Sequence, residues 1–325
     1  MDFDRHLRAL ATILFATLAT IVSAQATSPP IVAFLALASR DEAQVDALTR
    51  GLVENGLVPG HSVRLELRFA DGDPERARSH IAELVARGAK VFVTGGPNVA
   101  RMVQQQSKDV AIVVASLESL RVAGVAGTIA RPDGNITGFA TQADELIGKW
   151  FELLAEIMPG IKRIAMISNP ENRNQAERLA AARKAAEQLG LSILVVEISN
   201  ETMIESKLQQ VRAAGVEAAI IPRDFLFESI RPRLVSAALA ARLPSMYDEG
   251  TFVKLGGLIA YSPNRPDLFR RSAAYVARLL DGARPADLPI QQPTKFELVV
   301  NLKTAKTLGL TIPPSILIRA DEVIE

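Results

Sequence analysis

From residue 31 onward, short apolar runs alternate along the chain with stretches whose apolar residues recur at helical spacing. Runs such as 31–37 and 111–115 are typical of strands buried on both faces, and the amphipathic stretches after them predict helices. Glycines close many of these predicted helices, as at Gly56 and Gly190. This repeated strand–helix order predicts an α/β fold with parallel sheets and helices on both faces of each sheet.

The alternation breaks once, over 124–138, where four glycines and a proline fall close together, and it then resumes. We therefore expect two doubly wound parallel-sheet lobes joined by a multi-strand hinge. One late strand–helix pair could complete each array, which assigns 27–140 plus 250–288 to lobe 1 and 141–249 plus 289–325 to lobe 2. Such lobes leave a cleft between the carboxyl ends of two sheets, where small ligands bind.

The N-terminal segment has the order of a secretory signal peptide. Arg5 and Arg8 precede an apolar stretch over 9–22, and small residues follow it up to Ala24. An uncleaved membrane anchor is the alternative, but a spanning helix needs about 20 apolar residues, and this stretch has 14. We expect a signal peptide over 1–24. Because the chain has no cysteine to carry a lipid, we expect a free, exported protein in the periplasm.

Charge and composition exclude several classes of function. The chain has 37 Lys and Arg residues against 36 Asp and Glu, a formal charge of +1, which gives no general attraction to nucleic acid. It has no cysteine and three histidines, which excludes disulfides and thiolate metal sites and leaves little material for catalytic triads. The sequence contains no recognisable motif that pairs a catalytic nucleophile with a base. We therefore expect no enzyme activity, no cofactor and no metal.

In the first array, candidate ligand contacts follow predicted strands directly. Thr94, Gly95 and Gly96 lie between a strand and a helix, where glycines let the backbone approach a ligand and unpaired N–H groups suit a carboxylate. A tight turn would use the same residues. Ser39 and Ser116 also follow strands, where the carboxyl-edge rule places ligand contacts. Ser39 could instead cap the next helix.

In the second array, five residues are candidates for the opposite side of the cleft. The amides of Asn169 and Asn172 could bind a polar ligand head, although a turn and a helix cap would also favour them. Asp224 could bind an ammonium group or cap a helix. Phe225 could form an apolar wall or belong to the core, and Tyr247 could stack on a ligand. Together these residues indicate an amino acid as the solute.

Three other conspicuous residues are expected to have structural roles. Trp150 shares the apolar face of its predicted helix with leucines, which indicates a core position. Arg231 and Arg233 are expected on the solvated face of their helix.

The last third of the chain contains several long, distinctive runs: 270–276 (RRSAAYV), 282–289 (GARPADLP), 292–306 (QPTKFELVVNLKTAK) and 308–314 (LGLTIPP). Supporting runs are 93–96 (VTGG) and 130–139 (ARPDGNITGF). In these runs the chain resembles the ABC-transporter substrate-binding protein family that includes tryptophan- and tyrosine-type binding proteins, of the type I periplasmic-binding fold. The resemblance spans about residues 31–325.

The resemblance implies a protein that captures a small solute for import and delivers it to a membrane permease. We expect a monomer that binds no nucleic acid. A periplasmic sensor that passes ligand occupancy to a membrane receptor is the alternative, since the same fold serves both roles. An exported enzyme is a third possibility without a catalytic signature to support it.

Overall fold

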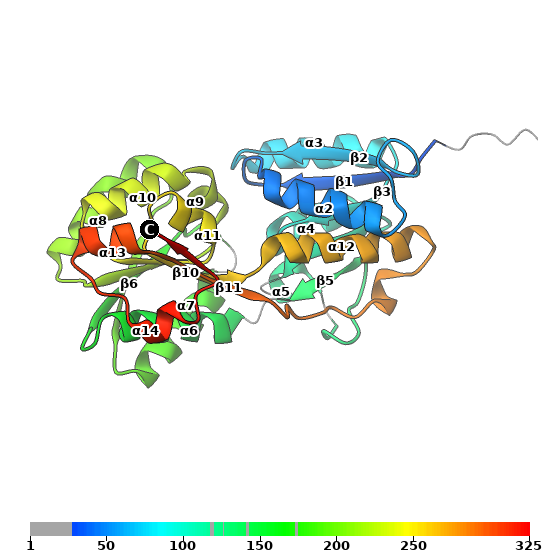
Figure 1. The fold of residues 1–325 in the computed structure, drawn as a ribbon. Coiled ribbons are helices and arrows are strands. Elements are labelled where there is room, and N and C mark those ends of the chain that lie inside the picture. Colours follow the sequence, from blue (N-terminus) through cyan, green and yellow to red (C-terminus); the bar gives the residue numbers. More distant parts are fainter. Residues whose placement is uncertain (1–27, 118–119, 126, 141–142, 173–174) are drawn as a thin grey trace, which may run out of the picture.

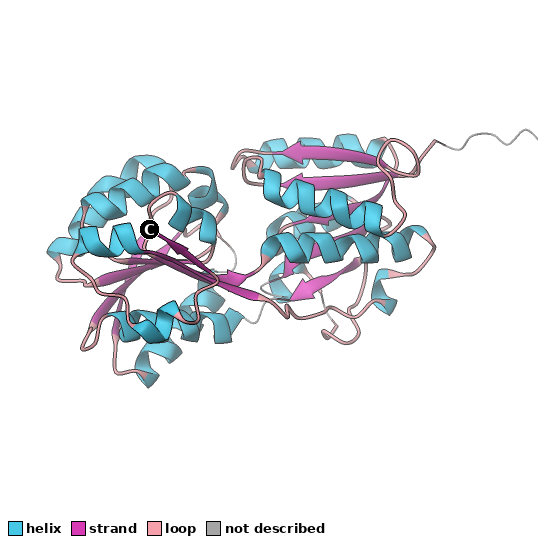
Figure 2. Cartoon of the chain, in the orientation of Figure 1, coloured by secondary structure: helices cyan, strands magenta, loops and turns pink. Residues whose placement is uncertain are grey.

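The computed structural model describes residues 28–117, 120–125, 127–140, 143–172 and 175–325. In these ranges the chain forms two α/β lobes that lie side by side (Figures 1 and 2). The predicted α/β class and the two parallel-sheet lobes are confirmed. No helix in the described ranges is both long and apolar enough to cross a bilayer. The expected signal peptide lies outside the described residues.

The first lobe is built on a five-stranded parallel sheet of order β2-β1-β3-β4-β5. Its strands are β1 (Ile31–Ala36), β2 (Arg64–Phe69), β3 (Ala89–Thr94), β4 (Ala111–Leu117) and β5 (Ile136–Ala140). Its helices are α2 (Glu42–Glu54), α3 (Pro74–Ala86), α4 (Pro97–Gln106), α5 (Leu120–Ala123) and α12 (Arg265–Leu280), with a 3-10 turn η2 (Pro285–Asp287). Apolar side chains of α2 and α12 cover one face of the sheet, and those of α3 and α4 cover the other.

The second lobe is built on a seven-stranded sheet of order β12-β11-β10-β9-β8-β6-β7. Its strands are β6 (Arg163–Ser168), β7 (Ser192–Glu197), β8 (Ala218–Ile221), β9 (Ser245–Tyr247), β10 (Ile259–Pro263), β11 (Phe296–Asn301) and β12 (Glu322–Ile324). Its helices are α6 (Ala143–Ile157), α7 (Gln175–Gln188), α8 (Ile204–Ala213), α9 (Phe225–Ser229), α10 (Arg231–Ala240), α11 (Gly250–Lys254), α13 (Leu302–Leu308) and α14 (Pro314–Leu317), with η1 (Glu201–Met203). Neighbouring strands are parallel except β10 and β11, which pair antiparallel.

Trp150 lies in the core as expected, and its indole N–H donates to the Tyr261 carbonyl at 2.7 Å.

The chain passes between the lobes three times: between β5 and α6, between β10 and α12, and between η2 and β11. Strand β10 lies between β9 and β11 in the second sheet, not in the first lobe, where we expected the whole of 250–288. The physical reason is packing, because α11 buries Phe252 and Val253 in the second lobe's core immediately before β10. Ile290 lies in the first lobe's core, so the last crossing falls just after it.

Helices α2 and α12 belong to distant parts of the sequence but pack closely in the first lobe (Figure 1). Gly51 makes this approach possible, because a Cβ atom at this position would overlap the carbonyl oxygen of Arg270 on α12. This contact fixes α12 on the first lobe and thereby fixes the position of its first turn, which faces the second lobe.

We predict opposite effects for two glycine-to-alanine substitutions inside helices. Gly51→Ala should lower the free energy of unfolding by roughly 1–3 kcal/mol, because the added methyl overpacks the α2–α12 contact. Gly148→Ala in α6 has open space around the new Cβ, so it should raise the free energy of unfolding by up to about 1 kcal/mol. Urea unfolding of both variants measures this, and equal effects would contradict the close α2–α12 packing.

Candidate functional site

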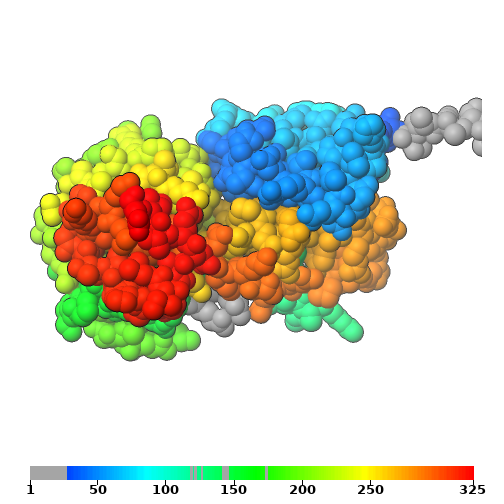
Figure 3. Space-filling model, viewed as in Figure 1, coloured from blue at the N-terminus to red at the C-terminus, as the bar shows by residue number. Residues whose placement is uncertain are grey.

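A cavity lies between the two lobes and is lined by both of them. It contains about 680 Å³ of space not filled by protein, including the part open to solvent. The first lobe contributes the segments after β1 and β3, and the second lobe contributes those after β6 and β8. These are the carboxyl ends of parallel strands, where the fold places ligands. In space-filling view the two lobes lie directly against each other (Figure 3).

The structure brings seven of the ten predicted site residues to this cavity. The residues that line it are Ser39, Thr94, Gly95, Gly96, Asn172, Asp224 and Phe225.

The other three predicted residues lie elsewhere. Ser116 is buried behind the turn, with its carbonyl oxygen 3.9 Å from the place a Gly96 Cβ would take. Asn169 is buried and donates to Asp224 Oδ1 at 2.9 Å, so it supports a lining residue from behind. Tyr247 is 1% exposed and stacks on Phe252 in the second lobe's core, with ring centroids 4.9 Å apart. The expected place of Tyr247 at the cleft edge is wrong, because β9 is a central strand with both faces covered.

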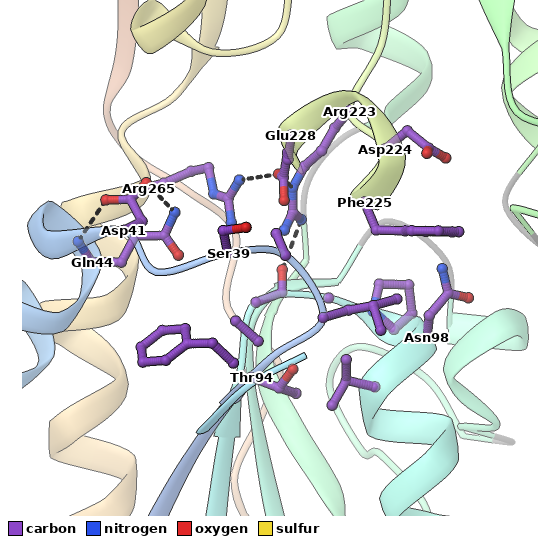
Figure 4. A pocket seen from close by; sticks show the side chains of 18 of the residues that line it. Ser39, Asp41, Gln44, Thr94, Asn98, Arg223, Asp224, Phe225, Glu228 and Arg265 are labelled. Atoms are coloured by element: carbon purple, nitrogen blue, oxygen red, sulfur yellow. Dashed lines mark hydrogen bonds and ion pairs between the residues drawn. The ribbon is translucent and has the colours of Figure 1, made fainter. Parts of the chain in front are cut away.

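The floor of the cavity is the turn between β3 and α4 (Figure 4). Thr94 is fully buried, and its hydroxyl has no hydrogen-bond partner among the described residues. Gly96 precedes Pro97, the first residue of α4, and no side chain caps this helix. The first-turn N–H groups of α4 and the Thr94 hydroxyl therefore offer donors to an anionic group in the cavity.

Asp224 forms the polar end of the opposite wall. It caps α9 by accepting from Leu226 N at 2.8 Å, and Asn169 and Asn172 donate to its two carboxylate oxygens at 2.9 and 2.7 Å. Burial raises the pKa of Asp224 despite these donors and the nearby charge of Arg178. The helix-cap interpretation of Asp224 is confirmed. Its place on the cavity wall also makes it available to a cationic group of a ligand.

Aromatic rings complete the cavity. Phe225 extends across the space toward Asn98 (Figure 4). Phe34 and Phe69, which the sequence did not single out, line the cavity from the first lobe with ring centroids 5.7 Å apart. Ser39 is exposed at the cavity edge and does not cap α2; Asp41 does, accepting from Gln44 N at 3.3 Å. The cavity thus combines an apolar wall with polar groups at two ends.

A cluster of buried charges lines part of the cavity, and the sequence did not indicate it. Glu228 Oε1 accepts from Arg223 Nε at 2.7 Å and from Arg265 Nη1 at 2.9 Å. Arg231 pairs with Glu249 at 2.9 Å. The side chain of Arg231 is 14% exposed, so the expectation of a solvated position is wrong for this residue. Arg231 lies on the side of α10 that is turned toward the interlobe space, where it pairs with Glu249.

Arg233, the neighbour of Arg231 on α10, behaves as expected. It is 42% exposed and pairs on the surface with Glu205 at 2.8 Å.

Glu228 is ionised over the whole ordinary pH range. Burial opposes its charge, but the charges of Arg223, Arg265 and Arg231 outweigh this effect and hold the pKa of Glu228 at about 2. A buried carboxylate with such neighbours is a fixed negative charge rather than a proton donor.

We predict that the contribution of Glu228 to stability depends on pH. Because the pKa of Glu228 is lowered from 4.5 to about 2 in the folded protein, its ionisation stabilises the fold above about pH 4.5, and this is lost as the pH falls toward 2. The full effect is roughly 3 kcal/mol. Glu228→Gln should therefore lower the free energy of unfolding near pH 7, by an amount that shrinks below pH 4.5.

Urea unfolding at a series of pH values measures this difference between the variant and the wild type. Glu187→Gln, an exposed change on α7, serves as the control and should show little effect. A Glu228→Gln effect that stays constant from pH 7 to pH 2 would show that ionisation of Glu228 does not stabilise the fold.

Fold and cavity together define a class of protein. Two parallel-sheet lobes, connected three times, enclose a cavity with hydrogen-bond donors at the turn that holds Thr94 and with acidic, basic and aromatic side chains on the remaining wall. Within the described ranges, no group of three His, Asp or Glu side chains is arranged to hold a metal ion. This is the architecture of a two-lobed solute-binding protein of the type I periplasmic-binding fold.

Residues 30–324 match the family of ABC transporter substrate binding proteins, and the chain belongs to this family. The family and fold predicted from the C-terminal runs are confirmed. Proteins of this family bind small-molecule solutes and work with ABC transporter permeases.

Similar proteins include binders of aromatic amino acids. A tyrosine-binding protein from Clostridioides difficile (strain R20291) is 20% identical over 261 residues, which is 80% of this chain and 75% of the relative. The structure of an ABC domain in complex with L-Trp from Streptococcus pneumonia has 25% identity and a TM-score of 0.83, covering 91% of this chain and all of the other. A conserved domain protein from Vibrio cholerae has 23% identity and a TM-score of 0.85 with the same coverage.

Proposed function

We propose that this protein is the extracytoplasmic solute-binding component of an ABC importer. It captures an amino acid in the interlobe cleft, closes around it and delivers it to a permease in the inner membrane. It acts as a periplasmic monomer and performs no chemistry on the solute. The observation that carries this proposal is the cavity itself, to which both lobes contribute polar and apolar groups.

The placement of charges supports an amino acid as the solute. A carboxylate fits the floor, where the first-turn N–H groups of α4 and the Thr94 hydroxyl are available. An ammonium group fits near Asp224, on the other lobe. The space between them is lined by Phe225 and Phe69, which favours an apolar or aromatic side chain. The tyrosine-binding relative and the L-Trp complex support the same class of solute.

Isothermal titration calorimetry with a panel of amino acids tests this proposal. L-tryptophan, L-tyrosine and L-phenylalanine are compared with small aliphatic and charged amino acids. We expect saturable one-to-one binding of at least one apolar or aromatic member. Ligand at about 100 times its Kd should stabilise the fold by roughly 2.7 kcal/mol, seen as a rise in Tm. Absence of binding across the whole panel, with a folded protein, would contradict the proposal.

The Thr94 hydroxyl provides a sharper test, because it has no partner within the described fold. Thr94→Val keeps the side-chain shape and should leave stability unchanged or slightly higher. It should weaken binding of the best amino acid of the panel by roughly tenfold, the loss of one hydrogen bond to a charged group.

Thr137→Val is the matched control for this substitution. The Thr137 hydroxyl is buried and donates to the Leu288 carbonyl at 2.7 Å, away from the cavity. This variant should lose about 1 kcal/mol of stability and keep its affinity. Unchanged affinity in Thr94→Val would remove Thr94 from the ligand site.

A further inference from the structure

Arg265 is a buried charge whose partners lie in the other lobe. It begins α12, a helix of the first lobe, and its side chain is 7% exposed. Its Nη1 lies 2.9 Å from Glu228 Oε1 (Figure 4). The same nitrogen lies 4.0 Å from Glu249 Oε2, and both carboxylates belong to the second lobe. In the described part of the chain, no carboxylate of the first lobe forms an ion pair with it. Burial of this guanidinium therefore depends on contact between the lobes.

Glu228 is the group that receives Arg265 across the cleft. The same oxygen, Oε1, accepts from Arg223 Nε at 2.7 Å, so the carboxylate also has a partner within its own lobe. Arg223 in turn donates from Nη1 to the Gly95 carbonyl of the first lobe at 2.8 Å. Two charge-assisted hydrogen bonds thus join the lobes at one point, from Arg265 to Glu228 and from Arg223 to Gly95.

The turn at Gly95 leaves room for this arrangement. A Cβ on Gly95 would lie 3.2 Å from Arg265 Nη2 and 3.3 Å from Arg223 Nη2, so both guanidinium groups lie over the bare glycine. Two like charges can be so close only because Glu228 lies between them. The pKa of Glu228, about 2, keeps its charge in place at any ordinary pH.

We propose that Glu228 and Arg265, with Arg223 on the Gly95 carbonyl, form an interlobe latch that populates the closed form of the ligand-free protein. The three side chains line the cavity itself, and their bonds between the lobes form only when the lobes meet. If the proposed function holds, ligand affinity rises with the fraction of molecules in the binding-competent closed form. Glu228 and Arg265 line the cavity, and as positioning residues they then set affinity through the closed fraction, whether or not they also contact the solute.

Double electron–electron resonance on the ligand-free protein measures the closed fraction directly. The chain has no cysteine, so Ser79→Cys on α3 and Ser236→Cys on α10 introduce the sole labelling sites. Both serines are exposed. Their helices belong to different lobes and lie on the edge of the molecule away from the β10–β11 crossing (Figure 1). Opening of the cleft should lengthen the distance between the two labels.

We expect a main population at short distance in the parent pair. Arg265→Gln should reduce the ratio of closed to open molecules by roughly ten- to a hundredfold, the loss of one hydrogen bond between charged groups. Glu228→Gln should open the protein at least as far, because it leaves Arg223 and Arg265 facing each other without the carboxylate. Arg278→Gln, an exposed change on the same helix, is the matched control and should leave the distances unchanged.

Three results would overturn the latch: a ligand-free parent that is mainly open, an Arg265→Gln variant with the parent's distances, or an Arg278→Gln variant that opens equally. Arg265 has its ion pairs across the cleft, so its substitution should leave the first lobe folded, and thermal unfolding of each variant checks this. The experiment adds no ligand. If no amino acid binds, the proposed function is contradicted. The distances measured without ligand still test the latch in that case.

Discussion

The three passages of the chain between the lobes are the constraint on which the site depends. They hold two separately folded sheets so that the carboxyl ends of their strands face one cavity. Neither lobe has a complete site alone, since the turn at Thr94 belongs to one and Asp224 to the other. A solute that contacts both lobes favours the closed form to the extent of its differential affinity for that form. In the proposed function, solute binding and closing of the cleft are therefore coupled.

The charged groups near the cleft divide into two sets with different roles. Asp224 and its two asparagine donors all belong to the second lobe, so their hydrogen bonds do not depend on contact between the lobes. Arg265 is different, because its carboxylate partners lie across the cleft. Buried ion pairs gain little over hydrophobic contacts, but loss of one partner is costly. An ion pair with one partner in each lobe therefore suits a contact that forms when the lobes close and breaks when they open.

Most of the fold was predictable from the sequence because parallel strands buried on both faces leave continuous apolar runs. The Thr94-Gly95-Gly96 turn and Asp224 were predictable for the same reason, since each directly follows such a run. The place of β10 was not, because strand order depends on long-range pairing with β11, which local patterns do not encode. Arg265 and Glu228 resemble ordinary surface charges on amphipathic helices until the two lobes are brought together. Tyr247 lies at the end of a parallel strand, where ligand contacts are expected. Its side chain instead packs against Phe252 in the core.

A crystal structure of the protein with its bound solute tests the central claim most directly. We expect a solute enclosed between the lobes, in contact with the turn at Thr94 on one side and with the wall around Asp224 and Phe225 on the other. A solute bound to a single lobe outside this cavity, with the cleft empty, would contradict it.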